Sequence, residues 1–86
     1  MRQELAVNHL NAIRLLQALV AAGANTRAPM DSAWVEKIAV RDMWLHGTGL
    51  ASAIAYAEAE GWLTDSRTRK GWTSITRTGE AVAKQK

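Results

Sequence analysis

The chain has 86 residues, no cysteine, four tryptophans and a formal net charge of +3. This length suits a single domain spanning residues 1–86 with a modest core, and the lack of cysteine excludes disulfides and thiolate metal sites. No apolar run approaches the ~18 residues of a membrane span, and the N-terminus does not resemble a secretory leader, so we expect a cytoplasmic protein with no membrane partner.

Residues 3–22 have the pattern of a first helix that ends at Gly23. Apolar residues recur at a period of 3.6 and form one stripe, at Leu5, Ala12, Ile13, Leu16, Leu19 and Val20. Leu10 and Leu15 flank the stripe and make it wider than one neighbour needs, which leaves open a homodimer through this helix. His9 projects near the middle of the stripe, where we expect a hydrogen-bonded histidine or, alternatively, a pH-sensitive contact.

A connector and a second helix come next. Pro29 favours extended geometry in the residue before it, which allows a very short strand at this point. Asp31 or Ser32 is expected to cap a helix that runs to about Asp42. Trp34 is interpreted as a core anchor rather than a ligand-stacking group. Because a buried indole N–H needs a partner, we expect the tryptophans to lie where core meets surface.

A third helix is predicted after a turn at residues 43–47, with Thr48 as its N-cap. Its inward face is expected to hold Leu50, Ile54 and Ala57. The opposite face consists of small, uncharged residues with a tyrosine to one side: Thr48, Ser52, Ala55, Ala59 and Tyr56. This face lacks the long polar side chains that usually make bidentate contacts to bases. It could hydrogen-bond DNA through its hydroxyl groups, or it could pack closely against a partner helix.

The last part of the chain has the pattern of a hairpin and a final helix. Gly61 is expected to end the third helix, because glycine adopts the left-handed cap conformation easily. Two strands are predicted at residues 62–64 and 72–75, and Thr76 is expected to open the C-terminal helix.

The predicted hairpin tip is cationic, with Arg67, Arg69 and Lys70. Residues 66–86 carry a net charge of +5, whereas residues 48–65 carry −3, so the positive field is expected on the hairpin and tail. Two interpretations remain open. The cations belong to a solvated turn that protects the strand edges, or they contact the phosphates or minor groove of DNA.

Two short runs, Gly61-Trp62-Leu63 before the cationic loop and Ile75-Thr76-Arg77-Thr78-Gly79 after it, resemble the pattern of winged helix-turn-helix domains. Such domains are common in small transcription regulators, including the MarR-like and PadR-like groups. The resemblance implies an α+β, mainly helical fold with a three-helix helix-turn-helix core, a β-hairpin wing and a short C-terminal helix. It also implies DNA-binding residues on the third helix and wing: Thr48, Ser52, Tyr56, Arg67, Arg69 and Lys70. The third helix departs from the pattern because it lacks basic residues.

Enzyme chemistry is not expected. The chain has two histidines and no Walker-type loop, H-E-x-x-H or G-x-S-x-G motif. Glu58 and Glu60 are two residues apart on a helix and therefore point in different directions. The sequence predicts no catalytic residue, metal site, cofactor or small-molecule ligand.

Two functional hypotheses follow from the sequence. The first is a transcription regulator that binds DNA through the third helix and the basic wing. The alternative is a winged-helix module for protein–protein interaction or dimerisation that does not bind DNA.

Overall fold

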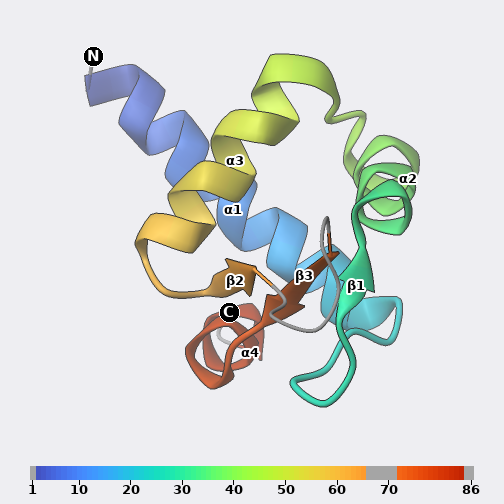
Figure 1. The fold of residues 1–86 in the computed structure, drawn as a ribbon. Helices are drawn as coiled ribbons and strands as arrows, with labels where there is room; N and C mark the ends of the chain where they lie inside the picture. Colours follow the sequence, from blue (N-terminus) through green and yellow to red (C-terminus); the bar gives the residue numbers. More distant parts are fainter. Residues whose placement is uncertain (1, 66–71, 85–86) are drawn as a thin grey trace.

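Figure 1 shows the fold in a computed structural model that describes residues 2–65 and 72–84. Within these residues, four helices and a three-stranded antiparallel sheet make an α+β, mainly helical domain, which confirms the predicted fold class at this level. The elements are α1 (Arg2–Ala21), β1 (Met30–Asp31), α2 (Ser32–Met43), α3 (Gly47–Ala59), β2 (Leu63–Asp65), β3 (Trp72–Ile75) and α4 (Arg77–Lys84). None of the helices in the described part of the chain is long and apolar enough to cross a bilayer.

Helix α1 is the central element of the core and contacts α2, α3 and α4 (Figure 1). Its residues Ala12, Leu16 and Leu19 are fully buried, as the apolar stripe predicted. Leu15 is also fully buried, although the sequence placed it on the flank of the stripe. The stripe is wide because it packs against three helices rather than one.

Two helices end at glycine in the left-handed conformation, as predicted. After α1, Gly23 has φ +109° and the Ala24 N–H donates to the Leu19 carbonyl at 2.9 Å. After α3, Gly61 has φ +78° and the Trp62 N–H donates to the Ala57 carbonyl at 2.8 Å. These are the bonds of a Schellman cap, which satisfies carbonyls that the helix itself leaves unpaired.

The sheet has the strand order β1-β3-β2. Strands β2 and β3 pair antiparallel with Leu63 opposite Ile75, which confirms a hairpin of two paired strands. The short strand considered near Pro29 is β1. It pairs antiparallel with β3, on the side of β3 that does not pair with β2. The hairpin tip at residues 66–71 lies outside the described residues.

Helix α2 begins and ends much as the sequence predicted. The Asp31 carboxylate is its N-cap and accepts a hydrogen bond from the Ala33 N–H at 3.0 Å. Val35 and Ile38 are buried against the core. The helix ends at Met43 rather than Asp42, within the accuracy of such boundaries.

Helix α3 starts two residues earlier than predicted. Its N-cap is His46, whose backbone is extended, and its first turn is closed by a bond from the Leu50 N–H to the His46 carbonyl. The prediction of Thr48 as N-cap is therefore wrong, because Thr48 already lies inside the first turn. Leu50 and Ala57 are buried as expected, and Ile54 is half-buried.

The junction between the hairpin and α4 is held by Thr76. Its hydroxyl accepts a hydrogen bond from the Gly79 N–H at 3.0 Å and donates to the Gly61 carbonyl. The Thr76 N–H donates to the Trp62 carbonyl at 3.0 Å. Thr76 thus caps α4, as predicted, and also ties the start of α4 to the end of α3.

Candidate nucleic-acid interface

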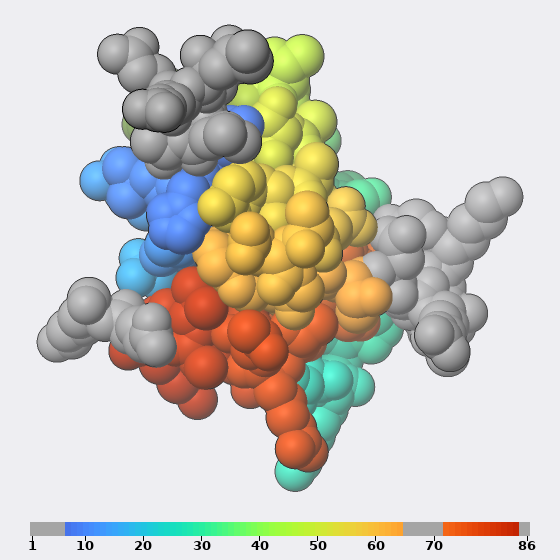
Figure 2. All heavy atoms as spheres, turned by 90° about the vertical axis from the view of Figure 1, so that its left-hand side faces the viewer, coloured from blue at the N-terminus to red at the C-terminus, as the bar shows by residue number. Residues whose placement is uncertain are grey.

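Helix α3, the element that the sequence assigned to a binding surface, lies at the molecular surface between α1 and α4 (Figure 2). Thr48, Ser52, Ala55 and Ala59 are exposed, so the predicted outer face of the helix is confirmed as a solvent-facing surface. All four side chains are small. A second surface could therefore approach the α3 backbone closely.

Tyr56, the third predicted contact on α3, is placed differently from Thr48 and Ser52. It is half-buried, and its hydroxyl is hydrogen-bonded to Nδ1 of His9 at 2.8 Å. Its ring lies 5.4 Å from the His9 ring and 5.9 Å from the Trp62 ring, between centroids. Tyr56 thus connects α3 to α1, and its hydroxyl is already engaged within the fold.

His9 has the hydrogen bond that the sequence led us to expect, although the residue itself is exposed rather than packed inside. Its ring also lies against that of Trp62 in an edge-type arrangement, with ring centroids 5.7 Å apart. The partnership of His9 with Tyr56 joins residues 47 positions apart in the chain. No local pattern could have revealed it.

The groove between α2 and the first half of α3 carries no positive charge from the residues that line it. It has a volume of about 290 Å³ and is lined by Ser32, Glu36, Gly47, Leu50, Ala51 and Ile54, all described by the structure. Glu36 is the ionisable group among them. Attraction of this region to phosphates would therefore have to come from cations outside α3 and this groove.

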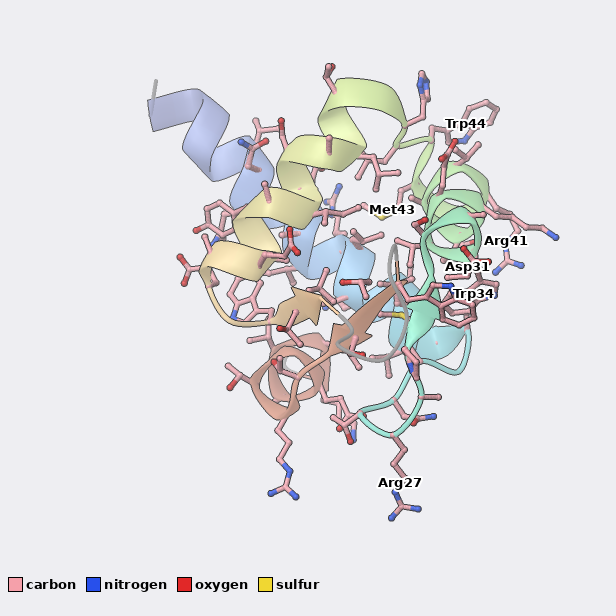
Figure 3. The ribbon with its side chains drawn as sticks, viewed as in Figure 1. Arg27, Asp31, Trp34, Arg41, Met43 and Trp44 are labelled. Atoms are coloured by element: carbon pink, nitrogen blue, oxygen red, sulfur yellow. The ribbon has the colours of Figure 1, made fainter. Side chains whose placement is uncertain are left out.

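The basic side chains placed by the structure come from α1, the loop after it, α2 and α4, and none comes from α3. They are exposed, and they are Arg14, Arg27, Lys37, Arg41, Arg77 and Lys84. Arg27 and Arg41 point in different directions from a loop and from α2 (Figure 3). The Arg41 Nε donates to the Asp42 Oδ1 at 2.8 Å; this hydrogen bond raises the pKa of Arg41 and lowers the pKa of Asp42.

The predicted wing cations Arg67, Arg69 and Lys70 lie outside the described residues. A side-chain hydrogen bond joins β2 and β3, the two strands that flank these residues in the chain. The Thr73 hydroxyl donates to the Thr64 carbonyl at 3.0 Å, across the β2–β3 pair.

The four tryptophans occupy different environments. Trp34 and Trp72 are half-buried, as expected for residues between core and surface, and Trp62 is buried. Trp44 departs from the expectation, because it is 86% exposed in the turn between α2 and α3. The neighbouring Leu45 is packed against the core.

No group of three or more histidine, aspartate or glutamate side chains suited to a metal ion occurs within residues 2–65 and 72–84. No protein-family model matches the chain, and neither the curated proteins nor the solved structures contain a match.

Proposed function

We propose that this chain is a winged helix-turn-helix domain that binds duplex DNA and acts as a small cytoplasmic transcription regulator. The observation that carries the proposal is the order and pairing of its elements. A helix and a short strand precede two helices and a hairpin, and the return strand of the hairpin lies between the other two strands. This order supports the resemblance drawn from the Gly61 and Thr76 runs of the sequence.

In this proposal α3 lies in the major groove of the duplex. The small face formed by Thr48, Ser52 and Ala55 allows the helix backbone to approach the bases. The two hydroxyl groups hydrogen-bond phosphates or base edges, and alanine methyls contact thymine methyls. Such contacts discriminate weakly between sequences, so most of the affinity comes from the phosphate backbone.

The wing cations supply this backbone affinity. Arg67, Arg69 and Lys70 contact phosphates or the minor groove next to the site of α3. Neutralised phosphates release counterions, so binding falls as salt rises, with a slope set by the number of contacts. Three such contacts predict a loss of affinity of about forty-fold between ~50 and ~200 mM salt.

The test is a fluorescence anisotropy titration of a labelled duplex at these two salt concentrations. We compare the parent chain with an Arg67→Ala/Arg69→Ala variant. The variant retains one of the three contacts, so its affinity should fall by only about three- to four-fold over the same salt range. Binding at low salt should be weaker for every duplex sequence tested, because phosphate contacts carry no sequence information.

The matched control is Arg14→Ala/Lys84→Ala, which removes the same charge from exposed positions on α1 and α4. It should retain most of the parent's salt dependence. Absence of binding at ~50 mM salt, or binding that does not respond to salt, would contradict the proposal. A wing variant with the parent's affinity would show that the wing does not make the contacts.

A protein-interaction module is the second candidate. It is favoured by the lack of positive charge on and around α3. The exposed face of α3 is small and uncharged at Thr48, Ser52 and Ala55, and the adjacent groove contains Glu36. These features suit close packing against another helix better than they suit a polyanion. Failure of the duplex titration would favour this candidate.

A further inference from the structure

A hollow of about 340 Å³ lies on the side of the molecule where the loop after α1 meets the sheet and the start of α2. It is lined by residues 22–25 and 28–31 together with Trp34 and Trp72, all of them described. This volume lies in the range of protein sites for small molecules. The hollow is separate from the α2–α3 groove, with which it shares no lining residue.

Three side chains give the hollow its chemical character: Asp31, Trp34 and Trp72. Asp31 in β1 lies directly opposite Trp72 in β3, and residues opposite one another in an antiparallel pair project from the same face. Trp34 lies in the first turn of α2, three residues after Asp31. The carboxylate is therefore flanked by one indole across the sheet and by another along the helix.

The walls of the hollow are ordered by hydrogen bonds. Asn25 accepts a bond from the Arg27 N–H at 2.9 Å and donates from its side chain to the Gly23 carbonyl at 3.3 Å. Asp31 is oriented by the bond that its carboxylate accepts from the Ala33 N–H at 3.0 Å. A ligand would thus enter a largely preformed site.

The charge of the hollow favours a cation. Among its lining residues, Asp31 is the ionisable one, and it is exposed. Arg27, which belongs to the same loop, extends away from Asp31 and Trp34 (Figure 3). Indole faces attract cations through the ring quadrupole, and a carboxylate adds a direct charge interaction.

We propose that this hollow binds a small organic cation, such as a quaternary ammonium group, between the indoles of Trp34 and Trp72 and beside the Asp31 carboxylate. An alkylated ammonium suits the site because its methyl groups pack on apolar walls while its charge stays near the carboxylate. The inference does not depend on DNA binding by α3 or the wing.

The test follows the four indole N–H signals of the full chain by NMR during a titration with choline. Choline chloride replaces sodium chloride at constant ionic strength. The signals of Trp34 and Trp72 should shift and saturate, with half-saturation on the order of millimolar for a ligand of so few atoms. The signals of Trp44 and Trp62 should not move, because neither residue lines the hollow.

Two comparisons test whether the positive charge of choline is what the hollow recognises. The uncharged isostere 3,3-dimethylbutan-1-ol has the same shape as choline and should bind at least three-fold more weakly. Asp31→Asn removes the charge but keeps a side chain that caps α2 equally well. It should weaken choline about five-fold, the ratio expected for two charges ~4 Å apart in water, and leave the isostere unchanged.

A further pair of variants tests the indole. Trp34→Leu should weaken choline at least three-fold, whereas Trp44→Leu, the same change at the exposed turn, should have no effect. If Trp34→Leu does not fold, Asp31→Asn still tests the charge, and the shifts of the Trp34 and Trp72 signals still locate the bound choline.

Four results would overturn the proposal. They are no saturable shift, equal shifts at all four indoles, equal binding of choline and its isostere, and unchanged choline binding by Asp31→Asn.

Discussion

Gly79 shows why one residue in the hairpin–α4 junction has to be glycine. A Cβ at this position would lie 2.2 Å from the backbone oxygen of Trp62 and 2.9 Å from Cγ1 of Ile75. The first contact is with main chain, which cannot rotate away as a side chain can. The close approach of α4 to the end of α3 therefore requires a residue without a side chain at this position. This requirement does not depend on the backbone conformation of Gly79.

We expect Gly79→Ala to lower the free energy of unfolding by about 2–3 kcal/mol or more, because α4 must shift away from Trp62. The matched control is Gly49→Ala within α3. There the new Cβ meets only Cδ1 of Leu45 at 3.2 Å, the end of a flexible side chain. Alanine also has the higher helix propensity, so the control should be neutral or stabilising by up to about 1 kcal/mol. Urea denaturation of both variants measures the difference, and equal stabilities would contradict the argument.

At the scale of the element, helices α1, α2 and α3 end by one mechanism with different residues. Glycine takes the left-handed position after α1 and after α3, at Gly23 and Gly61. After α2 the same conformation is held by Trp44, with φ +55°. A residue with a Cβ is disfavoured there by roughly 1–2 kcal/mol, and the 86% exposure of Trp44 means that little packing offsets this strain.

Trp44→Gly should therefore stabilise the fold, by about 1 kcal/mol after allowing for the greater freedom of glycine in the unfolded chain. Trp44→Ala provides the control, because alanine removes the indole but keeps the Cβ, and its stability should remain close to that of the parent. Thermal or urea unfolding measures both. A loss of stability in the glycine variant would mean that the exposed indole stabilises the turn by contacts outweighing the strain.

At the scale of the whole molecule, packing within one chain covers most of the apolar surface from which a homodimer was inferred. The broad apolar stripe of α1 is covered by α2, α3 and α4, and it includes the fully buried Leu15. In the described side chains of α1, the large apolar residues left exposed are Val7 at 55% and Leu10 at 46%. A homodimer through α1 remains a proposal that now depends on these two residues.

If α1 does mediate self-association, Val7→Ser/Leu10→Ser should convert a dimer into a monomer in sedimentation equilibrium without unfolding the chain. The physical reason is that the substitutions remove exposed apolar area and leave the buried Leu15 and Leu16 in place. Val40→Ser, at an apolar residue 39% exposed on α2, is the control and should leave the dimer intact. A parent chain that sediments as a monomer would contradict a homodimer through α1.

Local signals in the sequence predicted most of the elements. The 3.6-residue stripe predicted α1, Asp31 or Ser32 predicted the start of α2, and Thr76 predicted the start of α4. Gly23 and Gly61 predicted the ends of two helices. Each of these signals acts within about one helical turn, through a cap, a hydrogen bond or a side-chain period, so each is visible in a short stretch of sequence.

Local sequence signals of this kind predicted only part of the candidate sites. The sequence identified the exposed hydroxyls of Thr48 and Ser52 on α3. It could not show that the Tyr56 hydroxyl is bound to His9, because that contact depends on how α1 crosses α3. It predicted that Trp34 packs against the core, which the structure confirms, but it gave no sign that Trp34 also lines a hollow.

The amino-acid order alone therefore determined where helices and strands form and where the basic residues fall along the chain. Tertiary structure decided that Leu15 is buried, that Trp44 is exposed, and that Asp31, Trp34 and Trp72 line one hollow. The reason is the range of the forces. Caps and periodicity are set by neighbours in the chain, whereas burial and side-chain pairing are set by elements that meet only when the whole domain packs.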